Sequence, residues 1–330
     1  MHCIVTHTDL DGVVSAAVYI IGAGIRRGGY NVVFIEPTEV GEKLCNLIDG
    51  GVCSSVAVMD IGLGSDSFRD LLRCLDSGSG VAEVHWYDHH IWEREWVGEL
   101  SRYIDMDIDS SSRCAANVVA KSLGIETAVA MEYVDVTCAV DSWDFYRWEA
   151  PYLYRYTDYV KRFYGLDRAF RDILDAIERS IEVSQFIEWI EPFVERYIDE
   201  ELRIVTSICR DAREFDIEGR RICLYYRDFD IPNQSIVGNA LLNICNCSIA
   251  AIVRHDLSSI SFRSRDYNVR EIARRLGGGG HVRAAGAPLK INSILKISLG
   301  LPLPTRLKKT LLYNYIEKLL RDTLTSLTPI

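Results

Sequence analysis

Hydrophobic and polar positions along the first 150 residues follow a repeating pattern. Short apolar runs end at polar residues, and between them apolar residues recur at helical spacing. The predicted strands are "CIVTH", "NVVFIE", "SSVAVMD" and "VAEVHWYDHH". The predicted helices lie at 13–25, 39–50, 66–78, 113–124 and 128–144. Strands that alternate with helices in this way are typical of βαβ units, so we predict a mostly parallel sheet flanked by helices.

The pattern changes in the second half of the chain. An aromatic-rich helical region follows at 151–210, and short strands then return in "CLYY", "SIAAIVRH" and "SISFRS". A helix, "VREIARRLG", and a glycine-rich loop, "GGGGHVRAAGA", come next, and "LKKTLLYNYIEKLLRDTL" has the spacing of an amphipathic helix. We therefore predict an α/β protein with four parts: an N-terminal domain at 1–150, a helical connector at 151–210, a smaller α/β domain at 211–300 and a helical tail at 301–330 that could serve a homodimer.

Composition narrows the class of protein. The chain has 330 residues, 48% hydrophobic and 25% charged, as in ordinary globular proteins. No window approaches the roughly 18 consecutive apolar residues of a membrane span. The start, "MHCIVTH", has no basic region of the kind found in signal peptides. The expected location is the cytoplasm, with no membrane partner.

Charge is distributed unevenly. The net charge of −10 argues against a protein that coats nucleic acid non-specifically. Residues 258–283 nevertheless hold six Arg against one Asp and one Glu. Such a local excess suits a docking patch for phosphate or a short nucleic acid.

The ten cysteines are scattered, without a CxxC pair. Cys245 and Cys247 would share one face of a strand, but two thiolates do not make a zinc site. We expect buried, reduced cysteines, with disulfides as the alternative for a hyperthermophilic source.

Acidic residues follow the predicted strands. Asp9 and Asp11 come after the first strand, Asp60 ends the third, and the triplet Asp88-His89-His90 ends the fourth. The carboxyl ends of parallel strands share one edge of a sheet, where ligands bind. These side chains should therefore converge, and Asp141 in "CAVDSWDF" is a further candidate for the same edge.

Several carboxylates in one place repel one another unless cations neutralise them. A set of carboxylates with imidazoles suits manganese, iron or zinc better than calcium. Pairs of such ions about 3.5–4 Å apart clamp the attacking and leaving oxygens of phosphoryl transfer. The residues thus indicate a two-metal phosphohydrolase, although acids that follow strands also serve as helix caps.

Four short motifs carry a family resemblance. "THTDLDG", "VAVMDIG", "HWYDHH" and "AVDSWD" resemble, in this order, the motifs of the DHH phosphoesterase family. The later segment "ISFRSRDYNVREIARRLGGGGHVRAAGA" is similar to the DHHA1 domain of one branch of that family. The two modules together cover nearly the whole chain, apart from the connector and the tail.

The resemblance implies a site for two manganese ions, with magnesium as the alternative. Its implied ligands are Asp9, Asp11, Asp60, His89 and Asp141, with Asp60 as the bridge. It implies that Asp88 orients a histidine or the attacking water and that His90 contacts the scissile phosphate. His7 lies two residues before the first aspartate, where small-molecule members often have a histidine at four, so ligation and a structural role both stay open for it.

The DHHA1 resemblance implies a substrate-binding half, with the active site in the cleft between the domains. Glycine backbone can approach a phosphate closely and donate its amides. Charged side chains nearby would add further contacts to phosphate oxygens. The implied substrate residues are Arg263, Gly278, Gly279, Gly280, His281 and Arg283.

Other residues near the motifs allow two interpretations each. Asp144 could ligate a metal or orient a neighbour. Ser111, Ser112 and Arg113 could contact phosphate, but helix capping explains them more simply. The aromatic residues that could stack on bases or pack as a core are Trp143, Phe145, Tyr146 and Trp148.

These observations predict a metal-dependent phosphodiesterase that acts on short oligonucleotides or single-stranded RNA or DNA ends. Its substrate could be a very short strand, as for nanoRNases, or a longer single strand, as for RecJ-type exonucleases. The alternative is a small nucleotide, such as a linear or cyclic dinucleotide or adenosine 3′,5′-bisphosphate. A non-catalytic replication scaffold of the same fold is the remaining hypothesis.

Overall fold

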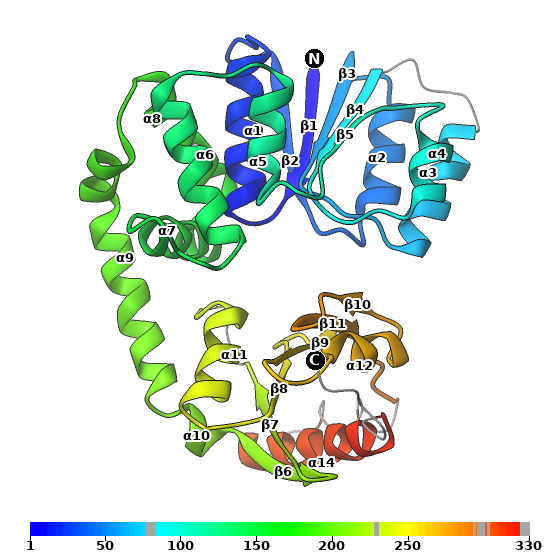
Figure 1. Ribbon diagram of the computed structural model, residues 1–330, viewed down its shortest axis with the longest axis vertical. Helices are drawn as coiled ribbons and strands as arrows, with labels where there is room; N and C mark the ends of the chain where they lie inside the picture. The colour runs from blue at the N-terminus through cyan, green and yellow to red at the C-terminus, as the bar shows by residue number, and fades with distance from the viewer. Residues whose placement is uncertain (77–82, 228–230, 293–294, 296–300, 302–303, 324–330) are drawn as a thin grey trace. The chain divides into compact units, whose positions relative to one another are not determined.

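The computed structural model describes residues 1–76, 83–227, 231–292, 295, 301 and 304–323 (Figure 1). The chain forms two compact units, Met1–Glu195 and Arg196–Ile330. Parts of three predicted elements fall outside the described residues: the end of the helix at 66–78, the start of "VAEVHWYDHH" and the last residues of the tail.

A five-stranded parallel sheet forms the centre of the first unit, in the order β2-β1-β3-β4-β5. The α/β class and the parallel sheet confirm the prediction. The edge strand β5 was not predicted, because its sequence "DMDI" has only two apolar residues and short polar edges give little signal. The strands are β1 (His2–His7), β2 (Tyr30–Ile35), β3 (Ser55–Met59), β4 (Glu83–Asp88) and β5 (Asp105–Ile108).

Helices cover both faces of this sheet (Figure 1). One face carries α1 (Leu10–Gly22), α5 (Ala115–Ser122) and α6 (Ala128–Asp141), and the other carries α2 (Val40–Asp49), α3 (Ser65–Asp76) and α4 (Arg94–Leu100). Trp86 of β4 is fully buried against Leu44 of α2 and Leu71 of α3. Helix α1 packs against α5 and α6, which is why small and apolar residues occupy nearly all of its positions. Both faces of the sheet are thus buried, as its continuous apolar strands require.

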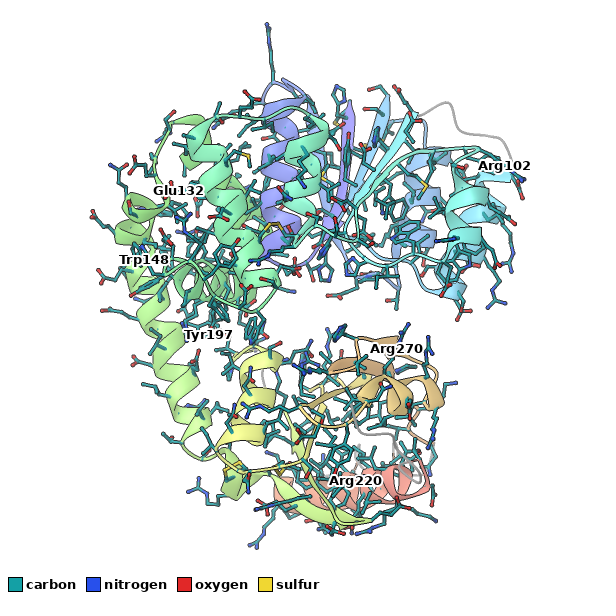
Figure 2. All side chains as sticks on the ribbon, viewed as in Figure 1. Arg102, Glu132, Trp148, Tyr197, Arg220 and Arg270 are labelled. Carbon is teal, nitrogen blue, oxygen red and sulfur yellow. A yellow bond between two sulfur atoms is a disulfide. The ribbon has the colours of Figure 1, made fainter. Side chains whose placement is uncertain are left out.

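The region predicted as a connector is divided differently in the structure. Helices α7 (Ala150–Phe163) and α8 (Leu166–Glu178) belong to the first unit, because their apolar faces pack on α6 and α1. Helix α9 (Val183–Val205) runs through the division, and the hydroxyl of its buried Tyr197 (Figure 2) accepts a hydrogen bond from the backbone of Asn233, 2.8 Å away. Neither α9 nor any other helix in the described ranges is long and apolar enough to cross a membrane.

The second unit has a six-stranded mixed sheet in the order β10-β11-β9-β8-β7-β6. Within this second sheet, β7 and β8 are the only parallel pair among the described strands. The strands are β6 (Arg213–Ile217), β7 (Arg220–Tyr226), β8 (Ile249–Val253), β9 (Ser259–Ser264), β10 (Gly279–Gly280) and β11 (Ala284–Pro288). The accompanying helices are α10 (Ile208–Asp211), α11 (Gln234–Asn243), α12 (Val269–Arg275) and α14 (Thr305–Thr323).

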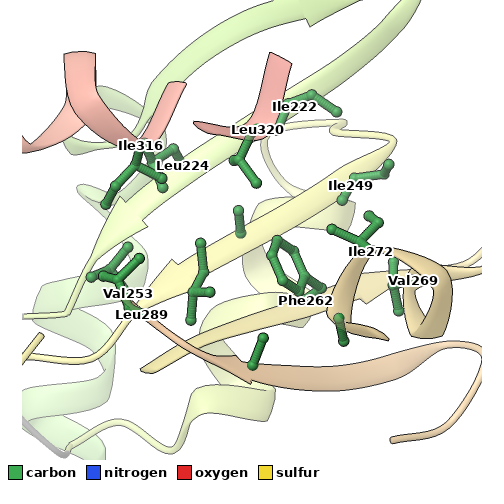
Figure 3. Close-up of a cluster of buried hydrophobic side chains, with 14 of the residues drawn as sticks. Ile222, Leu224, Ile249, Val253, Phe262, Val269, Ile272, Leu289, Ile316 and Leu320 are labelled. Atoms are coloured by element: carbon green, nitrogen blue, oxygen red, sulfur yellow. The ribbon is translucent and has the colours of Figure 1, made fainter. Parts of the chain in front are cut away.

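The central strands of this sheet serve two cores at once. Ile222 and Leu224 of β7 point into one core with Phe262, and α12 and α14 cover this core (Figure 3). Cys223 and Tyr225, the alternate residues of the same strand, point into a second core on the other face, beneath α10 and α11. The period of two along a strand explains this division, and it explains why β7 reads as a continuous apolar run.

The predicted tail helix is an integral part of the second unit. Helix α14 buries Leu312, Tyr313, Ile316 and Leu320 in the same core as Phe262 (Figure 3). Its apolar face is therefore satisfied by the chain's own sheet, and the suggestion that this helix serves a dimer has no support from its packing.

The expectation of reduced cysteines is wrong for eight of the ten residues. Four disulfides join cysteines that are 24 to 50 positions apart in the sequence: Cys3–Cys53, Cys114–Cys138, Cys209–Cys245 and Cys223–Cys247. The prediction relied on the usual redox state of a cellular compartment, whereas the fold brings the paired Cα atoms to 4.9–5.9 Å. Cys245 and Cys247 each pair with a different distant cysteine.

Candidate metal centre

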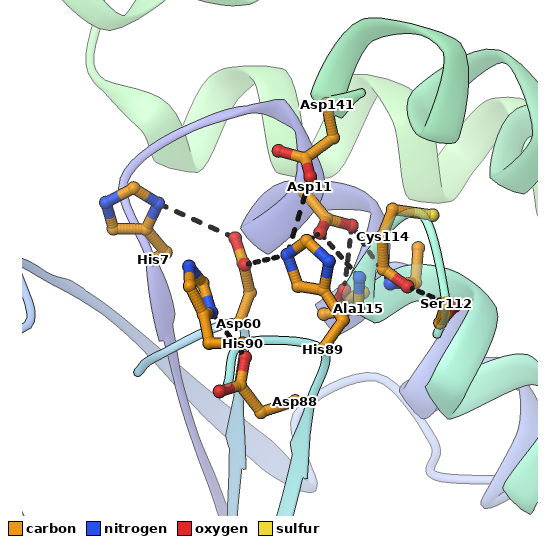
Figure 4. A network of polar contacts seen from close by, with 12 residues as sticks. His7, Asp11, Asp60, Asp88, His89, His90, Ser112, Cys114, Ala115 and Asp141 are labelled. Atoms are coloured by element: carbon orange, nitrogen blue, oxygen red, sulfur yellow. Dashed lines mark hydrogen bonds and ion pairs between the residues drawn. The ribbon is translucent and has the colours of Figure 1, made fainter. Parts of the chain in front are cut away.

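The carboxyl edge of the parallel sheet gathers the predicted residues (Figure 4). His7 ends β1, Asp60 follows β3, and Asp88 ends β4 with His89 and His90 directly after it. Asp9 caps the start of α1, Asp11 lies in the first turn of that helix, and Asp141 is the last residue of α6. The structure thus brings together in one place all eight residues that the sequence analysis assigned to this site.

Asp60 lies at the middle of the cluster and is 3% exposed. Its Oδ1 is 3.6 Å from Nε2 of His89, and its Oδ2 is 3.5 Å from Nδ1 of His7. Its backbone has a left-handed φ of +55°, a conformation that is uncommon for residues other than glycine and that often occurs at functional sites. Oδ2 is buried without a hydrogen-bond partner in the described part of the chain, so this carboxylate has an unused ligand position.

Two groups of possible ligands lie beside this carboxylate: one includes Asp60, and the other contacts it through His89, whose Nε2 is 3.6 Å from Oδ1 of Asp60. Asp60 forms the first group with His7 and Asp9, whose ligand atoms all lie within 4.8 Å of one another. Nδ1 of His7 is 2.8 Å from Oδ2 of Asp9, whose other oxygen accepts a hydrogen bond from the amide of Gly12. This second bond caps α1, so the helix start fixes the orientation of Asp9.

Asp11, His89 and Asp141 form the second group. Nε2 of His89 lies 3.4 Å from Asp141, 3.6 Å from Asp60 and 3.9 Å from Asp11. The buried Asp11 accepts hydrogen bonds from the first two amides of α5, at 2.6 Å from Ala115 and 2.9 Å from Ala116. The amino end of α5 therefore holds this carboxylate in place and partly offsets its charge.

The electrostatics of the second group reflect crowded negative charge. Burial raises the pKa of Asp11 well above its ordinary value, and the charges of Asp60 and Asp141 raise it further. Burial and Asp60 likewise raise the pKa of Asp141 to about 7. Burial works to lower the pKa of His89, but its contacts with these carboxylates prevail and raise that pKa to about 10. Without a bound cation, the cluster therefore balances part of its negative charge by holding protons.

Asp88 and His90 form a further group of possible ligands with Asp60 and His89, and within it they are paired with each other. The fully buried Asp88 accepts hydrogen bonds from Nδ1 of His90 at 2.8 Å and from Nε1 of Trp92 at 2.7 Å. Burial alone would raise the pKa of Asp88, but the bonds from His90 and Trp92 lower it below its ordinary value. The ring of His90 is half exposed, so Asp88 orients a histidine that is open to a ligand.

Glu36 also belongs to the cluster, although the sequence analysis did not select it. Its Oε2 lies 3.7 Å from Nε2 of His7, and its Oε1 accepts a 2.7 Å hydrogen bond from Thr8. The contact with His7 and the bond from Thr8 lower the pKa of Glu36 to about 2. Lys161 of α7 donates to the backbone of Thr8 at 2.6 Å and supports the same corner. The signal for Glu36 was present, because it directly follows β2 just as Asp60 follows β3.

In the second unit, Gly279 and Gly280 form strand β10 and Gly278 directly precedes it. The three predicted glycines differ in why they lack a side chain. A Cβ on Gly278 would lie 2.1 Å from the carbonyl oxygen of Gly286, and one on Gly280 would lie 2.7 Å from Cα of Ala285. Gly280 also has a φ of +129°, which side chains disfavour. A Cβ on Gly279 would meet no atom of the described residues within 4 Å. Packing therefore explains Gly278 and Gly280, but it does not explain Gly279.

The predicted cations lie close to this hairpin. The exposed His281 and Arg283 are in the turn, which is closed by a 2.7 Å bond from the amide of His281 to the carbonyl of Ala284. Arg263 of β9 pairs in register with Ala284, and its guanidinium donates to the carbonyl of Phe262 at 3.0 Å. Burial lowers the pKa of Arg263, and no carboxylate of the described residues forms an ion pair with it. A partly buried cation in that position suits an anionic ligand.

The residues with two interpretations have local partners. Asp144 pairs with Arg113 at 3.2 Å, and Ser112 donates to the carbonyl of Cys114 at 3.0 Å. Trp143 packs on Phe145. Ser111 donates to Asp109, and Tyr146 donates to Asp135, whereas Trp148 (Figure 2) is 60% exposed beside Tyr152.

Comparison with known proteins identifies one domain of the second unit and several solved structures with a similar fold. Residues 223–298 match the model of the DHHA1 domain. The chain is similar in structure to a pGpG-specific phosphodiesterase from Vibrio cholerae, with a TM-score of 0.53, 18% identity, and coverage of 94% of this chain and 99% of that chain. No curated protein matches the sequence significantly.

Two further solved structures share the fold. RecJ from Thermus thermophilus in complex with Mn²⁺ has a TM-score of 0.57 and 14% identity, over 88% of this chain and 49% of that chain. An exopolyphosphatase-related protein from Bacteroides fragilis has a TM-score of 0.51 and 13% identity, over 98% of this chain and 93% of that chain. The fold of the two units is therefore one that these proteins have in common.

Proposed function

We propose that the chain belongs to the DHH/DHHA1 phosphoesterase family and is a metal-dependent phosphodiesterase that hydrolyses short oligonucleotides or the ends of single-stranded nucleic acid. The match of residues 223–298 to the DHHA1 domain and the shared fold support this proposal. The observation that carries the proposal is the position of Asp60, whose two oxygens face two separate groups of ligand atoms. A carboxylate placed in this way is suited to bridge two cations.

The donor set fits a pair of manganese ions. His7, Asp9 and Asp60 would hold one ion, while Asp11, His89 and Asp141 would hold the other with the second oxygen of Asp60. The unpartnered oxygen of Asp60 and the crowded charge around Asp11 both favour occupation by cations. Mixed carboxylate and imidazole ligands suit manganese, and magnesium is the alternative.

The residues beside the ligands have roles of their own. When bound, a pair of divalent cations supplies the Lewis acidity for in-line attack of water on phosphorus. His90 would donate a hydrogen bond to an oxygen of the scissile phosphate, where negative charge develops. Asp88 would keep the proton of His90 on Nδ1 and hold the ring toward the substrate, as the 2.8 Å bond between them supports.

The second unit would bind the phosphates of the substrate. Packing against the described residues does not explain why Gly279 lacks a side chain. Its bare backbone would let a phosphate approach closely. His281 and Arg283 would add charge at the turn, and Arg263 would supply a partly buried guanidinium. These residues are the substrate-binding set that we propose.

The main alternative is a small nucleotide as the substrate. The chain covers 99% of a protein named as a phosphodiesterase specific for pGpG, which is a dinucleotide. It covers only 49% of the Thermus RecJ chain. These coverages favour a substrate of a few nucleotides over a long strand, and a linear dinucleotide lies at the boundary of the two hypotheses.

A digestion series tests the proposal directly. Purified protein with Mn²⁺ would be incubated with 5′-labelled RNA and DNA strands of about 2, 5 and 25 nucleotides, with EDTA as the control. We expect manganese-dependent loss of the short strands and much slower attack on the longest. Progressive shortening of the longest strand would instead indicate an exonuclease of the RecJ kind. Failure to cleave any strand, followed by failure to cleave cyclic dinucleotides and adenosine 3′,5′-bisphosphate, would contradict the proposed activity.

A further inference from the structure

One disulfide lies next to the proposed metal centre, because Cys114 directly precedes a residue that binds Asp11. Cys114 precedes α5, Cys138 lies in the last turns of α6, and the Cα atoms of this pair are 4.9 Å apart. Both half-cystines are buried, at 0% and 5% exposure. The bond therefore ties the start of α5 to the end of α6 within the first unit.

The start of α5 positions Asp11. The residue after Cys114 is Ala115, whose amide donates to Oδ2 of Asp11 at 2.6 Å, and Ala116 donates to Oδ1 at 2.9 Å (Figure 4). The backbone of Cys114 has the extended φ and ψ of −160° and 157° that precede the helix. Any movement of Cys114 would therefore move the two amides that hold this carboxylate.

The end of α6 positions Asp141. Asp141 comes three residues after Cys138, so the two side chains lie on the same face of α6, one turn apart. His89 lies between the two carboxylates, with Nε2 at 3.4 Å from Asp141 and 3.9 Å from Asp11. The disulfide thus joins α5, whose first amides hold Asp11, to α6, which carries Asp141. The carboxylates of Asp11 and Asp141 stand on either side of His89 and repel each other across the site.

The other disulfide of the first unit has no such connection. Cys3 is the second residue of β1 and Cys53 precedes β3, so this bond lies toward the amino ends of the strands. At about 3.3 Å per residue, Cys3 is some 13 Å along β1 from His7. The Cys3–Cys53 bond also closes the longer loop, 50 residues against 24. It therefore serves as a matched control for the general effect of a cross-link on stability.

We infer that the Cys114–Cys138 disulfide is a positioning element for one half of the metal site, the half formed by Asp11, His89 and Asp141. This inference rests on the proposed function, because it assigns these residues to a bound cation. With the bond broken, α5 and α6 can separate and this half-site loses its geometry. The other half, formed by His7, Asp9 and Asp60, keeps its own supports.

The test compares manganese binding in full-length variants. Mn²⁺ is titrated calorimetrically into metal-free wild type, Cys114→Ala/Cys138→Ala and Cys3→Ala/Cys53→Ala, and electron paramagnetic resonance reports whether two ions are coupled. We expect two ions in the wild type and in the control variant. In the Cys114/Cys138 variant we expect one ion with unchanged affinity and a second bound about 10–100-fold more weakly, with loss of the coupled signal.

A second variant separates the cross-link from the helix start. In Cys114→Ser/Cys138→Ser, the new hydroxyl can cap α5 and support folding, but it cannot link α5 to α6. The same weakening of one ion is expected in this variant. Its thermal midpoint should fall no more than that of the Cys3/Cys53 variant, which loses the longer loop.

The outcomes distinguish the two proposals. Wild-type binding of two ions with unchanged affinities in both the Ala and Ser variants would overturn the positioning role alone. Equal weakening in the Cys3/Cys53 variant would also overturn it, because general loss of stability would then explain the effect. A wild type that binds no Mn²⁺ would overturn the proposed function and this inference together.

Discussion

At the edge of the parallel sheet, Asp11, Asp60 and Asp88 are buried to 2%, 3% and 0% exposure. At the β10–β11 hairpin of the second unit, the positions assigned to the substrate are glycines next to exposed cations. The first region therefore carries charged groups where a fold would be more stable with apolar ones. The second region lacks side chains where the chain would be stiffer with them.

The two regions lower the stability of the fold in different ways, one electrostatic and one steric. In the first unit the destabilising feature is electrostatic, so cations and pH should relieve it. In the second unit part of the feature is steric and belongs to the fold, because Gly278 and Gly280 have no room for a Cβ. Of the three glycines, only Gly279 has room for a Cβ among the described residues, so packing does not explain why it is a glycine. The following experiments address this contrast.

The largest effect should come from Asp60→Asn. Asparagine keeps the shape and tolerates the left-handed backbone at this position, but it removes the charge shared by both ligand groups. We expect the rate of manganese-dependent hydrolysis to fall by about 10³-fold or more, measured as kcat/KM. We also expect the melting temperature of the metal-free protein to rise, because a buried and repelling carboxylate is gone.

Asp66→Asn is the matched control for this experiment. Its side chain is 86% exposed in α3 and pairs with Arg69. Neither activity nor melting temperature should change appreciably in this variant. Retention of normal activity in Asp60→Asn at saturating manganese would contradict the bridging role.

Alanine at neighbouring glycines should separate packing from binding. Gly278→Ala forces a Cβ against the backbone of Gly286, so we expect a loss of about 2 kcal/mol in the free energy of unfolding. Gly279→Ala should leave stability nearly unchanged and raise KM for short strands by about tenfold, since the methyl group would occupy the approach of a phosphate. Chemical denaturation and steady-state kinetics measure the two effects, and equal KM values for Gly279→Ala and wild type would remove this residue from the binding set.

The smallest effect concerns pH in the metal-free first unit. The pKa of Asp141 is raised from 3.8 to about 7, so the folded state holds its proton more tightly than the unfolded state. The stability that this group contributes is full below pH 3.8 and is lost as the pH rises through about 7. Asp141→Asn should remove this slope, so its melting temperature should vary less with pH across that window than that of the wild type, by several °C.

Asp144→Asn provides the comparison for the pH experiment. Asp144 lies three residues further along but pairs with Arg113 at 3.2 Å. This variant should keep the wild-type dependence on pH. If both variants behave alike, the pH dependence has its origin outside the cluster.

In the first unit, the elements with the strongest hydrophobic pattern were the ones that the sequence predicted. Four strands with continuous apolar runs were found, and the rule that acids follow parallel strands located the sheet edge at which the candidate ligands gather. The edge strand β5 was missed because "DMDI" carries little apolar signal. Glu36 was missed although it follows β2, because the family motifs directed attention to other strand ends.

Features that depend on contacts between distant segments could not be predicted. Helices α7 and α8 looked like a connector because their apolar faces give no indication of which partner they meet. The disulfides depend on which cysteines the fold brings within reach, and their spacing of 24 to 50 residues carries no such information. The amides of Ala115 and Ala116 that hold Asp11 belong to the backbone, so no residue type marks them.

The anchoring of Asp11 by these amides has a consequence for how the site tolerates mutation. Ala115 occupies the first position of α5, where helices accept proline most readily, and the extended backbone of Cys114 suits the residue before a proline. Yet proline has no amide hydrogen, and at this position it would remove the shortest hydrogen bond to Asp11. Larger side chains, by contrast, would leave that bond chemically intact and would be limited only by space. Proline, which ordinary helices accept at their first position, should therefore disturb the site at residue 115. A larger side chain that keeps the amide hydrogen should not.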